Sequence, residues 1–97
     1  MSLADGVARV GPVLEAGDVA DALVAAIREE NPDVTVDDRG AYVRVSVPRV
    51  CRLSRQAVER RLGRAFRLPG DLERVMPSFK GRLKMDDDGA SWELGAS

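Results

Sequence analysis

The feature that most constrains the fold is a change in the period of the apolar residues along the first half of the chain. Over residues 19–27, apolar side chains recur at the i, i+3, i+4, i+7, i+8 spacing of a helix with one buried stripe. Asn31-Pro32 ends this helix, because the residue before proline avoids helical backbone. Over residues 41–47 the period falls to two, which is typical of a strand with one buried face. Helix and strand patterns in one short chain predict an α+β fold.

The segments before and after this helix also show clear patterns. Residues 7–14 favour an extended strand, but Gly11-Pro12 interrupts it and predicts an edge position or a bulge. Gly17-Asp18 opens the helix, and the Asp18 carboxylate is expected to accept an early backbone N–H. Residues 34–37 and 41–47, on either side of Asp38-Arg39-Gly40, predict a hairpin.

The second half of the chain repeats the order of helix and hairpin. Ser54 is the expected N-cap of a second helix that stops at Gly63. A shorter helix is expected within residues 68–76, starting near Asp71. Residues 78–85 and 91–94 predict two strands joined by an acidic turn. The expected order is β-α-β-β-α-(α)-β-β, with two helix-plus-hairpin halves and ferredoxin-like character.

The length of 97 residues, 44% of them apolar, fits one compact domain over residues 1–97, with residues 1–9 as a loose tail. No run approaches the length of a membrane span, so no membrane partner is expected. Cys51 is the only cysteine, which excludes an intramolecular disulfide and favours a cytoplasmic location.

The charges are unevenly distributed along the chain. Residues 1–48 carry nine acids and four bases, whereas residues 49–85 carry three acids and eleven bases. Such a distribution predicts a polarised surface suited to a charged partner, or simply solvated faces on opposite sides.

Catalytic chemistry has little support in the sequence. The chain contains no histidine, so the commonest general base and transition-metal ligand are missing. Cys51 has no histidine to activate it, and Ser54 is better explained as a helix cap. Asp86, Asp87 and Asp88 lack the ligand spacing of a calcium loop and are expected to form a solvated turn. A small enzyme that uses carboxylates alone would need two acids converging in a pocket, which no spacing here specifies.

The basic segment, residues 49–84, allows one other function. Its arginines and lysines could follow a phosphate backbone, as in a small nucleic-acid-binding module. Such sheets also need exposed stacking aromatics, and no aromatic-rich strand is present. The prediction is therefore that nucleic acid is not the partner, since an arginine-rich face is equally suited to an acidic protein surface.

Four local motifs resemble one protein family in order and spacing. They are VGPVLEAGDVADAL at residues 10–23, VDDRGAYVRV at residues 36–45, LGRAF at residues 62–66 and SFKGR at residues 78–82. Together they resemble the effector (coupling or regulatory) proteins of soluble bacterial multicomponent diiron monooxygenases. Members of this family serve methane, phenol, toluene and alkene hydroxylases, and the first two motifs are most similar to the toluene and aromatic branch.

The resemblance implies a non-catalytic protein with no metal and no organic cofactor. It implies binding to the diiron hydroxylase component, in competition with the reductase or ferredoxin, and control of substrate access, oxygen activation and coupling. It also implies that residues 76–82, here called the contact segment, touch the hydroxylase near its substrate route. The members of this segment are Met76, Pro77, Ser78, Phe79, Lys80, Gly81 and Arg82.

Two residues of the contact segment have alternative interpretations. Phe79 alternates with Lys80 and Arg82, and alternation alone favours a core position for the ring. Gly81 is equally expected where two strands pack closely. The short tail further implies that a mechanism driven by a long N-terminal tail, as in the methane enzymes, does not transfer.

Overall fold

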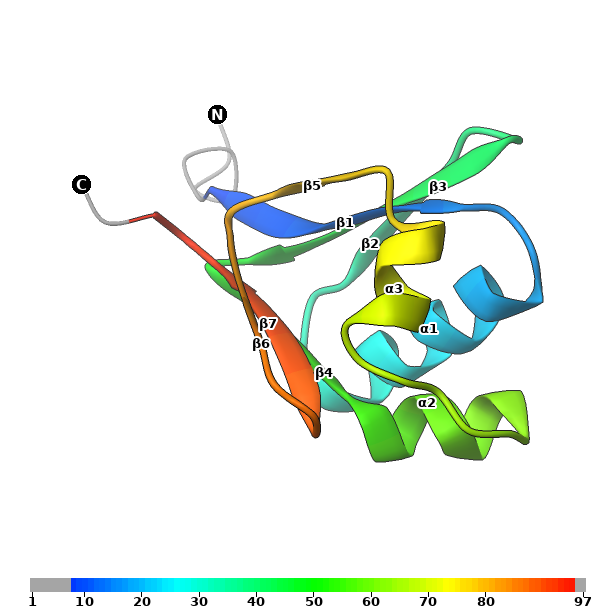
Figure 1. The fold of residues 1–97 in the computed structure, drawn as a ribbon. Coiled ribbons are helices and arrows are strands. Elements are labelled where there is room, and N and C mark those ends of the chain that lie inside the picture. The colour runs from blue at the N-terminus through cyan, green and yellow to red at the C-terminus, as the bar shows by residue number, and fades with distance from the viewer. Residues whose placement is uncertain (1–7, 96–97) are drawn as a thin grey trace.

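The computed structural model describes residues 8–95, which form seven strands and three helices in an α+β arrangement (Figure 1). In chain order the elements are β1 (Arg9–Glu15), α1 (Asp18–Glu30), β2 (Thr35–Asp38), β3 (Tyr42–Pro48), β4 (Val50–Ser54), α2 (Arg55–Leu62), α3 (Gly70–Val75), β5 (Ser78–Lys80), β6 (Arg82–Met85) and β7 (Gly89–Glu93). The α+β class is confirmed, and both expected hairpins are present. Of the expected tail, residues 1–7 lie outside the described residues, while Arg9 already belongs to β1.

The strands form two antiparallel sheets. The first has the order β2-β3-β1-β5 and the second the order β4-β7-β6. Two of these strands were not expected from the sequence. β4 follows β3 directly, after a turn at Arg49 with positive φ. The expected strand over residues 78–85 is divided at Gly81 into β5 and β6, which belong to different sheets.

The prediction that β1 is an edge strand or carries a bulge is wrong. β1 lies between β3 and β5, and its register with β3 is the same before and after Gly11-Pro12, as the pairs Val10–Val47 and Val13–Arg44 show. No residue is therefore inserted. Glycine is required at position 11 because a Cβ there would collide with the carbonyl oxygen of Val45 on β3.

The helices pack their apolar stripes into one core. α1 contacts α2 and β4, and its buried residues include Leu23, Ala26 and Ile27, as the spacing predicted. The expected cap at Asp18 is wrong: Gly17 is the N-cap and makes no side-chain hydrogen bond, because Asp18 is already the first helical residue. The other caps are confirmed, since the Ser54 hydroxyl accepts from the Ala57 N–H at 3.2 Å and Gly63 ends α2 in the left-handed conformation.

Cys51 lies fully buried opposite Trp92 on the inner face of the second sheet. Burial raises the pKa of its thiol to about 12, so the sulfur stays protonated at neutral pH. None of the helices in residues 8–95 is long and apolar enough to cross a membrane.

Candidate partner-binding site

The contact segment crosses from one sheet to the other at the surface. Met76 follows α3 and is buried, residues 78–80 form β5, and Arg82 begins β6. Every residue from Pro77 to Arg82 is exposed. Figure 1 shows this stretch of chain running over β1 and then turning down into the second sheet. Six of the seven expected residues, from Pro77 to Arg82, thus form one continuous exposed stretch, whereas Met76 lies buried just before it.

Phe79 is the large apolar side chain of this feature. It lies opposite Pro12 in the β5–β1 pairing, and 44% of its surface is exposed. The core position that alternation favoured for Phe79 is therefore wrong, because nearly half of the side chain is exposed. The reason is its place in the sheet: β5 is a short edge strand, so only one neighbouring strand is available to cover it.

Gly81 occupies the corner between β5 and β6. Its φ is +106°, which side chains rarely adopt. A Cβ at this position would lie 2.8 Å from the Glu93 carbonyl oxygen and 2.8 Å from Cγ1 of Val10. The close-packing interpretation of this glycine is thus supported by the geometry. Val10, which the sequence analysis did not assign to the site, packs against the backbone at Gly81.

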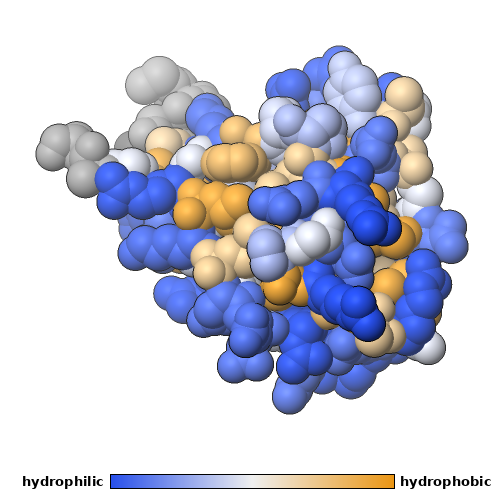
Figure 2. Space-filling view, viewed as in Figure 1, coloured by the Kyte–Doolittle hydropathy of each residue, from blue (hydrophilic) through white to orange (hydrophobic). Residues whose placement is uncertain are grey.

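Beside the contact segment, β6 places two further apolar side chains at the margin of the core. Leu83 and Met85 are partly buried and lie opposite Trp92 and Ala90 of β7. Figure 2 shows apolar surface gathered between the positions of β5 and β6, bordered by charged side chains. The alternation of β6 predicted these inward positions, but it did not show that they lie at a sheet edge.

The outer face of the second sheet is charged. Arg82 and Lys84 of β6 lie opposite Glu93 and Ser91 of β7, and the Lys84 ammonium lies 3.3 Å from the Glu93 carboxylate. The hydrogen bond from Lys84 holds the pKa of Glu93 below its usual value. The contact segment is therefore flanked by apolar surface on one side of β6 and by charge on the other.

The basic residues do not form one free stripe. Arg60 and Arg61 both bind Glu29 at 2.9 Å, and Arg55 binds Glu59 at 3.0 Å. The two large exposed aromatics are Tyr42 and Phe79, which face opposite sides of the first sheet because their partners, Glu15 and Pro12, do. This arrangement offers no stacking platform beside the arginines, which argues against the nucleic-acid alternative.

The acidic residues Asp86, Asp87 and Asp88 form the turn between β6 and β7, as expected, and the Asp86 side chain stabilises it. Asp86 Oδ1 accepts hydrogen bonds from the N–H groups of Asp88 and Gly89 at 2.8 and 3.0 Å. Within residues 8–95, no group of three or more potential metal ligands is brought together.

Comparison with known proteins agrees with these features. The model of the MmoB/DmpM family matches residues 8–93. The effector subunit of an alkene monooxygenase system from Xanthobacter autotrophicus (strain ATCC BAA-1158 / Py2) is 47% identical over 85 residues, covering 86% of this chain and 83% of the relative.

Two solved structures of a phenol hydroxylase–regulatory protein complex contain chains with a similar fold. The first has a TM-score of 0.80 at 25% identity and covers 91% of this chain and all of the matched chain. The second has a TM-score of 0.75 at 24% identity and covers 90% of this chain and all of the matched chain.

Proposed function

The chain belongs to the MmoB/DmpM family, and from this membership we propose that it is the effector subunit of a multicomponent diiron monooxygenase. In this role it binds the hydroxylase component and contributes no reacting group. The observation that carries the proposal is the family match over nearly all of the described residues, together with a relative that is itself an effector subunit.

The proposed action is a shift in the conformational equilibrium of the hydroxylase. An effector without chemistry of its own can change turnover only if it binds the reaction-ready form more tightly than the resting form. Substrate access, oxygen activation and coupling of electron use to product would all follow from that preference. The substrate itself is selected by the pocket of the hydroxylase.

We propose the contact segment as the part that touches the hydroxylase. Its exposed edge strand, the half-exposed Phe79 ring and the adjacent apolar margin of β6 give a small hydrophobic centre. Lys80 and Arg82 add positive charge at the rim, which suits an acidic partner surface and speeds association. The reductase or ferredoxin component is expected to compete for the same area of the hydroxylase.

Two further points belong to the proposal. The whole chain is proposed to act as one domain, because β5 of the second half joins the first sheet and α1 of the first half contacts α2 and β4. The single, buried cysteine supports a cytoplasmic location.

Reconstitution tests the function directly. The purified chain is added in increasing amounts to its hydroxylase and reductase, and product formed per NADH consumed is measured. We expect this ratio to rise and to saturate near one effector per active site. The Phe79→Ala variant should lower the ratio more than Asp87→Ala, which changes only a side chain in the solvated turn. A ratio that does not respond to the wild-type chain would contradict the proposed function.

A further inference from the structure

The contact segment is the middle of a longer strap that runs from Phe66 to Asp88 and includes α3, β5 and β6. Residues 77–82 of this strap are all exposed, and β5 is held by only three paired positions on β1. Few buried contacts therefore fix the exposed stretch directly. Its position therefore depends on what flanks it, which is the buried Met76 on one side and the β6–β7 pairing on the other, and also on how the two ends of the strap are attached.

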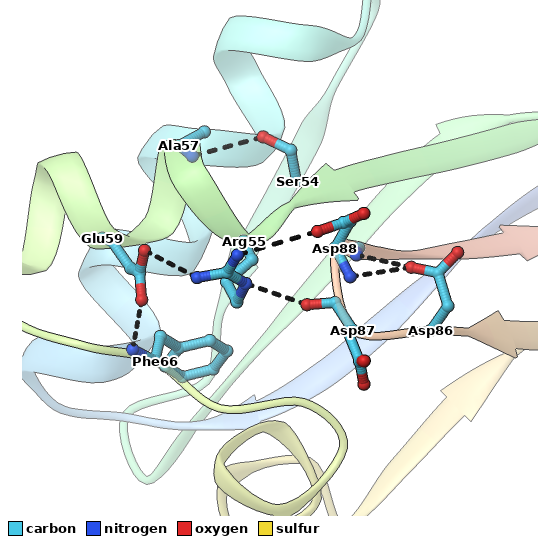
Figure 3. Close-up of polar contacts among 9 residues, drawn as sticks. Ser54, Arg55, Ala57, Glu59, Phe66, Asp86, Asp87 and Asp88 are labelled. Carbon is cyan, nitrogen blue, oxygen red and sulfur yellow. Dashed lines mark hydrogen bonds and ion pairs between the residues drawn. The ribbon is translucent and has the colours of Figure 1, made fainter.

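Both ends of the strap are attached to the first turns of α2. At the C-terminal end, Arg55 binds two main-chain carbonyl groups of the β6–β7 turn, and Figure 3 shows the contact of its guanidinium with Asp87. Its backbone N–H donates to the Asp88 carbonyl oxygen at 2.8 Å, and its Nε donates to the Asp87 carbonyl oxygen at 2.8 Å. The charge contact with the Asp88 carboxylate is longer, at 3.6 Å, and that side chain is 91% exposed.

At the N-terminal end, Glu59 holds the strap where it leaves α2. One carboxylate oxygen of Glu59 accepts from the Phe66 backbone N–H at 2.9 Å, and the other accepts from Arg55 Nη1 at 3.0 Å. Phe66 is buried in the core, so this hydrogen bond fixes a well-anchored point. Figure 3 shows the Glu59 carboxylate between Phe66 and Arg55, and the guanidinium between Glu59 and the turn.

We propose that Arg55 and Glu59 act as a clamp that positions the contact segment for docking without touching the partner. The inference rests on the proposed function and deepens it. A single guanidinium, one turn of helix from the carboxylate, links the start of the strap to its end. Both side chains are largely covered, at 32% and 27% exposed, so the pair is better shielded from solvent than an ordinary surface ion pair.

The expected consequence of opening the clamp is weaker binding. When only a fraction of the free protein has the docking-competent shape, the apparent dissociation constant rises by the inverse of that fraction. If the competent fraction falls to about one fifth, the Kd for the hydroxylase rises about fivefold. Because Arg55 reaches the turn mainly through backbone carbonyls, Asp87→Ala and Asp88→Ala should leave the Kd nearly unchanged.

The test compares Arg55→Ala and Glu59→Ala with a matched control, Glu29→Gln. Glu29 also joins two elements through arginines, since it binds Arg60 and Arg61, but these contacts link α1 to α2 and leave the strap untouched. The Kd for the purified hydroxylase is measured by titration, and the free energy of unfolding of each variant by urea denaturation. We expect a rise of about fivefold for the two clamp variants and less than about twofold for the control at a similar loss of stability.

Two readouts separate positioning from general destabilisation. Amide hydrogen exchange in the free protein should become faster in β5 and β6 of Arg55→Ala, with α1 and the β2–β3 hairpin unchanged. The double variant should bind no more weakly than either single variant, because both open the same clamp. The milder variants Arg55→Lys and Glu59→Gln serve if the alanine variants do not fold.

Equal losses of affinity in the clamp variants and in Glu29→Gln would overturn the inference, and so would unchanged exchange in β5 and β6. Failure of the wild-type chain to bind the hydroxylase would instead refute the proposed function. The exchange experiment on the free protein would then still decide whether the clamp holds the strap.

Discussion

Truncation of Phe79 to alanine should weaken docking far more than its effect on folding would suggest. An aromatic side chain can bury about 150–250 Å² in total. With 44% of Phe79 still exposed, about 65–110 Å² remains for a partner to cover. At about 25 cal/mol per Å², covering that area contributes about 1.6–2.8 kcal/mol. The expected rise in Kd for the hydroxylase is therefore about 15- to 100-fold.

The chain offers a matched control in Tyr42, whose exposed fraction is also 44%. Tyr42→Ala should cost similar folding stability, because a similar share of its ring is buried, but it faces the other side of the first sheet. Both variants are titrated into the hydroxylase by calorimetry at one fixed salt concentration, after urea denaturation has shown their stabilities. A larger loss of affinity in Tyr42→Ala would refute the reasoning and move the docking surface to the outer face of β3.

The other predictions concern stability and reactivity. Gly81→Ala should lower the free energy of unfolding in urea by about 1–3 kcal/mol more than Gly40→Ala, because both glycines have positive φ but only Gly81 has atoms in the way of a Cβ. Cys51 should resist iodoacetamide at pH 8 until the protein unfolds. Stability measured by thermal melts should also fall as the pH rises from about 9 toward 12, since the unfolded thiol loses its proton first. Hydrogen bonds from Arg60 and Arg61 lower the pKa of Glu29, so they stabilise the fold above pH 4.5. This stabilisation is lost as the pH falls through the lowered pKa. Glu29→Gln should therefore make the urea midpoint of unfolding less sensitive to acid.

Local patterns in the sequence predicted most of the elements that are formed by interactions between residues close in sequence. The stripe of α1, the Ser54 cap and the stop at Gly63 are confirmed, because helix periodicity and capping act within a few residues. The β2–β3 hairpin is confirmed for the same reason. The Asp18 cap failed by one position, which is the usual uncertainty at a helix end.

The other misses depend on contacts between distant parts of the chain. β4 pairs with β7, about forty positions away, and only this pairing makes its five residues a strand. Alternation over residues 78–85 could not reveal that Gly81 divides them between two sheets, because the division depends on how closely Glu93 and Val10 approach. Phe79 followed the alternation of a core residue, yet a sheet edge has no second strand to cover it. The site residues came from the family resemblance. The clamp was missed because its side chains bind backbone groups 7 and 32 positions away, which no local pattern reveals.

Two edge strands, β5 beside β1 and β4 beside β7, differ in how their outer backbone groups are covered. This difference bears on function. At β4, Asn31 accepts from the Arg52 N–H and donates to the Arg52 carbonyl, and Glu30 accepts from the Ser54 N–H, so side chains from the end of α1 cover the edge. At β5, no side-chain hydrogen bond from any residue between 8 and 95 covers the strand in this way. An uncovered edge invites pairing with other chains, and proteins usually shorten, charge or cover such edges. β5 is short and carries Lys80, which limits that risk, and the Phe79 ring beside it is 44% exposed. If the contact segment is the docking site, we expect the partner to cover the edge of β5 together with the exposed Phe79 ring.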